Sequence, residues 1–203
     1  MKAKCLLMGL VTITLFHGVL KCQVKTDSFL LNFDSKRIQR QQTAMIILGT
    51  WSVANLATGI AMRSNSTGDG YYFHEMNAGW NAVNLAIAGS GFLALRKQKA
   101  ASNAFEALEN SLKFEKSLLF NAGLDLAYIA TGVYLLERGM NENTLKNRQR
   151  FRGYGRSIIL QGAFLFLFDS VLYYRESRFS SALRKGMQTV YLTPEGLGLG
   201  ISF

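Results

Sequence analysis

Two acidic residues, Asp125 and Asp169, stand inside long apolar stretches of this sequence, where a carboxyl group could do chemistry. A carboxylate in the middle of a lipid bilayer costs about 2.5–3.5 kcal/mol on insertion scales, so it is normally protonated, paired or in contact with water. Neither stretch contains a Lys or Arg that could pair with its acid. We therefore expect Asn, Gln and Tyr to donate hydrogen bonds to them. The two acids could relay a proton or cation, line a small-molecule pocket, or fix helix register as polar contacts between helices.

Side-chain amides accompany these acids at helical spacing. Within each apolar stretch the polar residues recur every three, four, seven or eight positions, which places them on one side of a helix. Counted from the ends of the stretches, Asn55, Asn84 and Asp125 lie near the middle of a membrane, and Asp169 lies nearer one surface. The predicted intramembrane polar network consists of Asn55, Asn81, Asn84, Asn121, Asp125, Gln161 and Asp169.

His74 and Glu75 form a second candidate site, at one membrane face. One His beside one Glu is not a metal site, which usually needs three or more converging ligands, so we expect no metal and no cofactor. His74 could act as a general acid or base only if a substrate docked there. With the aromatic residues 71–73 it fits an interfacial belt better. The sequence has no G-x-S-x-G, H-E-x-x-H or phosphate-loop motif, which argues against an enzyme.

Four long apolar windows must position these residues. A helix of about 20 residues crosses a bilayer core of about 30 Å, and only a helix satisfies the backbone of an isolated segment in lipid. A soluble bundle would need a charged face on each helix, and these windows hold almost no charge. The fold predicted is all-α, a four-helix transmembrane bundle with spans at 43–62, 76–95, 117–136 and 157–174.

The segments around the windows are polar. Residues 23–42 read as a short amphipathic lead-in, in which Asp34 and Ser35 could cap a helix that continues into the first span. The connection 96–116 has apolar residues at helical spacing, which predicts an amphipathic helix. Residues 176–203 form a polar tail, and alternation around the turn residue Pro194 predicts a short β-hairpin.

The first 22 residues have the pattern of a signal sequence. Lys2 and Lys4 form a positive start, and Cys5–Val19 is apolar over the expected length. Cleavage near Cys22 would leave a chain without cysteines, since Cys5 and Cys22 are the only two. Lipid modification of Cys22 and an uncleaved anchor are the alternatives.

The net charge is +10, and several of the basic residues fall at the ends of the apolar windows. Lys and Arg at such places anchor helices among lipid headgroups, so the charge indicates a bilayer and not nucleic acid. With four spans, one side carries 13 Lys and Arg and the other seven. The positive-inside tendency places the richer side in the cytoplasm, whereas a cleaved signal places it outside. We give the signal precedence.

The run Phe73–Ala86, FHEMNAGWNAVNLA, resembles a family of small bacterial membrane proteins of unknown function. Trp51–Asn55, Ala130–Gly132 and Gln161–Asp169 fit the same resemblance, which spans roughly residues 35–175. It implies a signal sequence and four spans, and it implies no activity.

The sequence therefore predicts an integral membrane protein, in the bacterial inner membrane, that serves as a structural or interaction component. The alternative is a small transporter or ion-coupled channel subunit that uses the intramembrane carboxylates. The expected partners are the lipid bilayer and either a second copy or another membrane protein.

Overall fold

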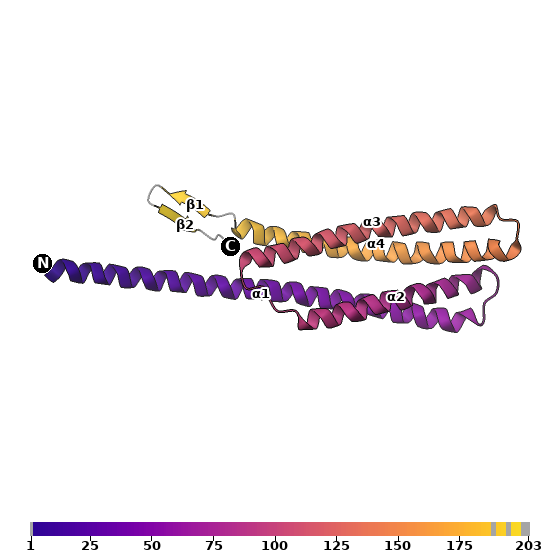
Figure 1. Cartoon of the computed structure of the whole chain (residues 1–203), viewed down its shortest axis with the longest axis horizontal. Helices are drawn as coiled ribbons and strands as arrows, with labels where there is room; N and C mark the ends of the chain where they lie inside the picture. Colours follow the sequence, from indigo (N-terminus) through magenta and orange to yellow (C-terminus); the bar gives the residue numbers. More distant parts are fainter. Residues whose placement is uncertain (1, 188–189, 194–195, 200–203) are drawn as a thin grey trace.

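The computed structural model describes residues 2–187, 190–193 and 196–199, with side chains over 32–103 and 105–184. Its helices are α1 (Lys2–Arg63), α2 (Asp69–Lys97), α3 (Ala104–Met140) and α4 (Leu145–Met187). They form two antiparallel hairpins, α1 with α2 and α3 with α4, which lie side by side (Figure 1).

Each of the four helices is long and apolar enough to cross a membrane, which confirms the predicted four-helix arrangement. Within the described residues, the surface carries many large apolar side chains and the interior holds amides and carboxyls. Soluble bundles have the opposite distribution, because they keep charge on the face that meets water. Among the exposed apolar residues are Ile47, Ile60, Val83, Leu119 and Leu167.

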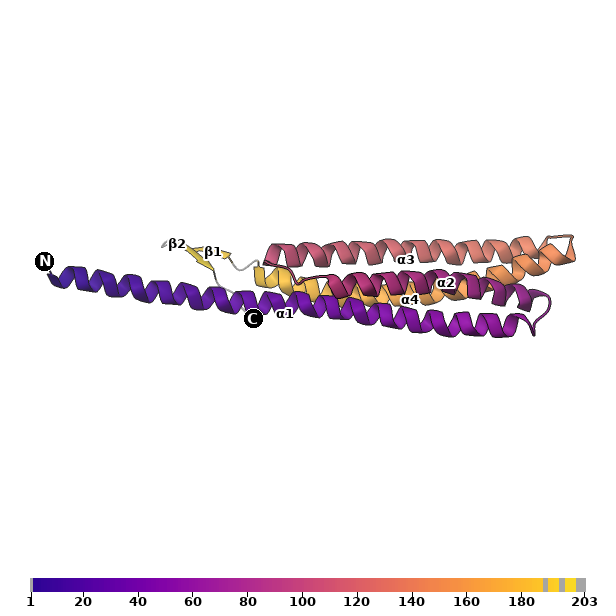
Figure 2. The same cartoon turned by 60° about the horizontal axis from the view of Figure 1, so that its bottom comes forward.

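In Figure 2 the helices of the bundle run alongside one another. Small residues allow them to approach closely. A Cβ atom added at Gly132 of α3 would lie 2.7 Å from the carbonyl oxygen of Gly155 on α4. A Cβ atom at Gly59 of α1 would lie 2.9 Å from the backbone nitrogen of Ala78 on α2. Close backbone packing of this kind holds helices together in lipid, where no hydrophobic force drives them together.

Three helices continue well past their apolar windows at one end of the bundle. We name this end the head: residues 32–42 of α1, the loop 98–103, residues 104–116 of α3 and residues 175–187 of α4. Its apolar core is formed by Phe33, Ala101, Ala107 and Leu183. At 1.5 Å per residue, the 37 residues of α3 rise about 55 Å, which exceeds a bilayer core of about 30 Å. The amphipathic helix predicted for the middle connection is the first part of α3, and only 98–103 lies outside a helix.

The predicted cap at Asp34 and Ser35 is wrong. α1 does not begin there, because it is continuous from Lys2 to Arg63. Residues on the N-terminal side of Asp34 are already helical, so no free N–H groups need capping, and the Asp34 carboxylate serves tertiary contacts instead. α1 also passes through Cys22 without interruption, so signal cleavage stays a prediction.

Two short strands follow α4, within the region for which the sequence predicts a hairpin. Strand β1 (Val190–Thr193) pairs antiparallel with β2 (Gly196–Leu199), with Val190 opposite Leu199. Pro194 and the last four residues lie outside the described residues.

Candidate site: an acidic groove between the second and third helices

Three residues of the predicted network belong to one closed hydrogen-bonded cluster centred on Asn77. Gln161 Nε2 donates to Asn77 Oδ1 at 2.6 Å, and Asn77 Nδ2 donates to the Asn55 carbonyl oxygen at 3.1 Å. Asn81 Nδ2 donates to the Asn77 carbonyl oxygen at 2.8 Å, and Trp51 Nε1 donates to Gln161 Oε1 at 3.0 Å. The cluster joins α1, α2 and α4 through Asn77, Asn55 and Gln161, which fix how these helices sit against one another, whereas the bonds of Asn81 lie within α2.

Asn77 and Trp51 were missing from the predicted network. Asn77 shares the helical face of Asn81, four residues away, so its position on the stripe was visible in the sequence. The sequence W-x-x-x-N-L-A occurs at both Trp51 and Trp80, so a repeat marks these two indoles. No spacing within one helix, however, shows that Trp51 donates to a side chain on the fourth helix.

The other four predicted residues line a groove of about 480 Å³ to which all four helices contribute. Asn84 lies on α2, Asn121 and Asp125 lie on α3, and Asp169 lies on α4. The structure therefore divides the predicted network between a closed cluster and an open groove.

The rim of this groove is apolar and faces away from the bundle. Val83 and Ile87 of α2 and Leu124 of α3 line it, and each of these side chains is exposed. Trp80 of α2 and Tyr128 of α3 also line it, and their rings meet edge to face with centroids 4.8 Å apart. If the four helices lie in a membrane, the groove has an acidic floor and opens toward lipid.

The two carboxyl groups of the groove face each other. Asp125 is 3% exposed and Asp169 is 7% exposed, and their side chains are within hydrogen-bonding reach of one another. We expected Asn, Gln and Tyr to donate to them, and this expectation is wrong for the described side chains. Gln161 donates to Asn77 instead, and Asn84 Nδ2, although it lines the groove, has no partner among the described residues.

Two buried polar atoms of the groove have no hydrogen-bond partner among the described residues. They are Asn84 Nδ2, a donor, and Asp125 Oδ2. The groove lining contains no Lys, Arg or His. Buried polar atoms are nearly always hydrogen-bonded, so the groove can still accept a donor or a cation at Asp125 Oδ2 and an acceptor at Asn84 Nδ2.

The neighbouring residues His74 and Glu75 differ in their contacts: Glu75 bonds to two other helices, and the Nδ1 atom of His74 has no partner among the described residues. Glu75 Oε1 accepts from Arg63 Nη2 at 2.8 Å, and Glu75 Oε2 accepts from the Tyr154 hydroxyl at 2.7 Å. Glu75 thus ties α1, α2 and α4 together near the short loop. His74 Nδ1 is buried without a partner among the described residues. Among all the residues that the structure describes, no three His, Cys, Asp or Glu side chains converge as metal ligands.

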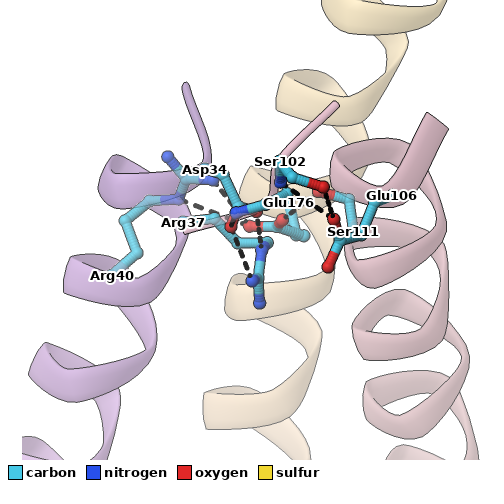
Figure 3. Close-up of polar contacts among 8 residues, drawn as sticks. Asp34, Arg37, Arg40, Ser102, Glu106, Ser111 and Glu176 are labelled. Atoms are coloured by element: carbon cyan, nitrogen blue, oxygen red, sulfur yellow. Dashed lines mark hydrogen bonds and ion pairs between the residues drawn. The ribbon is translucent and has the colours of Figure 1, made fainter. Parts of the chain in front are cut away.

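The head contains a second polar network, which sequence reasoning missed (Figure 3). Arg40 Nη2 donates to Glu176 Oε2 at 2.9 Å, and the Ser111 hydroxyl donates to Glu176 Oε1 at 3.1 Å. Asp34 accepts from Arg37 Nε at 2.6 Å and from the Ala101 backbone N–H at 2.8 Å. Arg40 and Glu176 are 136 residues apart, so their pairing leaves no local signal in the sequence.

The family model for a family of unknown function, DUF6992, matches residues 47–170. The chain belongs to this family. The resemblance to a family without an assigned function is thereby confirmed, and the match carries no activity. No curated protein and no solved structure matches the chain. The matched range includes all the groove residues of α2, α3 and α4 named above, and it excludes Arg40 and Glu176 of the head.

Proposed function

We propose that this chain is an integral membrane protein that acts as an interaction component, and that its groove binds a partner's transmembrane helix carrying a basic residue. One observation carries the proposal: Asp125 and Asp169 are buried together at the floor of an apolar-rimmed groove whose lining has no cation. A Lys or Arg from a partner would supply the missing charge.

Energetics favour an occupied groove. An unpaired ionised side chain at mid-membrane costs about 2.5–3.5 kcal/mol on insertion scales, and acids in membranes are normally found paired or facing a protein interior. Val83, Ile87 and Leu124 would contact the apolar surface of an incoming helix, and Asp125 and Asp169 would pair with its cation. A partner helix would therefore lower the free-energy cost of burying Asp125 and Asp169, and it would not expose polar groups to lipid.

A second copy of the chain does not fit this role. Its four apolar windows contain no Lys or Arg, so it has no cation to offer at the depth of Asp125. The partner is thus a different membrane protein. The location that goes with the proposal is a bacterial inner membrane, supported by the resemblance and by the signal pattern of residues 1–22.

The test uses two synthetic transmembrane peptides of Leu and Ala, identical except for a central Lys in one and a central Leu in the other. Energy transfer between labelled peptide and the full chain in lipid vesicles measures association. We expect the Lys peptide to associate at least tenfold more tightly than the Leu peptide. The double variant Asp125→Asn with Asp169→Asn should abolish this preference, because it removes both carboxyl groups and keeps the shape of the groove.

Thr131→Val is the matched control. Thr131 lies on α3, is exposed, and donates only to the carbonyl oxygen of Ala127 on its own helix, so the variant should bind as the wild type does. Equal binding of both peptides, or an unchanged preference in the double variant, would refute the proposal. Proton or sodium flux through vesicles that contain the chain alone would instead identify a small transporter.

A further inference from the structure

We propose that a pocket between α1 and α4, at the edge of the apolar region, binds the headgroup of an anionic phospholipid. The pocket has a volume of about 340 Å³. Lys36, Arg40 and Arg175 line its outer part, and Thr43, Ile47 and Leu172 line its inner part. It shares only Phe114 and Leu172 with the groove described above, so the two sites can be tested separately.

The outer part of the pocket carries a net positive charge. Its one acid, Glu176, is buried and already accepts from Arg40 and Ser111. Lys36 and Arg175 are exposed, and neither forms an ion pair with a carboxylate in the part of the chain that the structure describes. Two cations are therefore available to an incoming anion.

Arg40 is held in position before any ligand arrives. Its Nε and Nη2 atoms donate to Glu176, and its guanidinium lies over the Phe179 ring, 3.5 Å from the centroid. Nη1 is left for a further acceptor, since no hydrogen bond from it to a described residue is present. A fixed guanidinium loses little side-chain entropy on binding a phosphate, which favours a built site over a loose cluster of charges.

The depth of the pocket matches a lipid. Thr43 begins the first apolar window and Leu172 lies near the end of the fourth, so the cations stand just outside the hydrocarbon region. The exposed side chain of Ile47 continues the pocket toward the membrane interior. Basic pockets between transmembrane helices bind anionic headgroups, and an acyl chain could lie along Ile47 and Leu172. A free phosphate would use only the outer half.

The experiment is a native mass spectrometry titration of the full chain, released from detergent, with phosphatidylglycerol and with phosphatidylcholine. We expect phosphatidylglycerol to bind more tightly. Lys36→Gln with Arg175→Gln should weaken it roughly 30-fold, on the scale by which each cation strengthens binding to an anionic surface. Arg96→Gln with Lys97→Gln removes two cations from the end of α2, outside the pocket, and should change binding less than twofold.

Equal binding of the two lipids, or equal losses in the two double variants, would overturn the proposal. If the double variant fails to fold, the single variant Lys36→Gln takes its place, because Lys36 is exposed. It should weaken phosphatidylglycerol binding about fivefold. A competition arm distinguishes the source of the anion. Glycerol phosphate at millimolar concentration should not displace phosphatidylglycerol, whereas displacement would show a site for free anions and sink the lipid assignment.

Discussion

Asp34 is buried in the head, where its carboxylate accepts from Arg37 and from the Ala101 backbone N–H. Arg37 is itself only 2% exposed, so losing Asp34 leaves a buried guanidinium unpaired. We expect Asp34→Ala to lower the free energy of unfolding by about 3–5 kcal/mol, the usual cost of breaking a buried pair from one side. Titration of the purified protein from mild detergent into a denaturing one, followed by circular dichroism, measures this.

Glu109→Ala provides the matched control. Glu109 pairs with Lys113 at 2.7 Å on the exposed face of the same head, and both side chains are largely exposed. Such a pair contributes about 0–1 kcal/mol, so the variant should unfold close to the wild-type midpoint. If both variants lost equal stability, the buried position of Asp34 would have no special role.

Which residues are polar and share a helical face could be predicted from the sequence, because that depends only on spacing. Asn81, Gln161 and Asp125 were found in this way. Their division into a closed cluster and an open groove could not be predicted, since it depends on which neighbouring helix each face meets. Asn77 shows the limit: it becomes the centre of the cluster because α1 and α4 both bring partners to it.

Among the helices, α3 and α4 are packed through glycine. A methyl group at Gly132 would meet the Gly155 carbonyl oxygen and the Ile159 backbone, at 2.7 and 3.0 Å, and these atoms cannot move without shifting α4. We expect Gly132→Ala to destabilise the protein by about 1–3 kcal/mol, the usual range for overpacking. The same detergent titration measures it.

Gly123→Ala, on the same helix, tests whether the effect comes from packing. Nothing lies within 4 Å of a Cβ atom built there, and Ala is favoured over Gly inside a helix by about 1 kcal/mol. The variant should be as stable as the wild type or slightly more stable. A similar loss at both glycines would mean that helix propensity or lipid contact, and not the approach of α4, sets the stability.

The apolar windows predicted the four helices but not how far each helix continues past its window. Charged residues such as Glu109 and Lys113 lie outside the apolar windows, and from the sequence they are assigned to a connection between spans. In the structure the same helix continues through them, because Phe33, Ala107 and Leu183 supply a small water-side core. How far α3 continues past its apolar window is therefore decided by contacts between segments that are far apart in the sequence.

If the four helices span a membrane, the loop 98–103 and the end of α4 lie on one side and the loop 141–144 lies on the other. Single cysteines at Lys99→Cys and Asn143→Cys, in a chain with Cys5 and Cys22 replaced by Ser, report this through a membrane-impermeant maleimide. Because the signal takes precedence over the charge bias, we expect labelling of the first variant in intact cells and of the second only after permeabilisation. The reverse result would show that the basic residues set the orientation, and labelling of both or neither would contradict four spans.

The unbroken course of α1 limits how the chain can meet a bilayer. Its leading apolar segment ends at Val19 and its first span begins at Thr43, and a straight helix between them rises about 35 Å. That distance is greater than the thickness of a hydrocarbon core, about 30 Å, so a straight helix that crosses the bilayer cannot bury both segments in it. If the four helices lie in a membrane, α1 can bury both of these segments in the same bilayer only when it is cut or bent between the two positions.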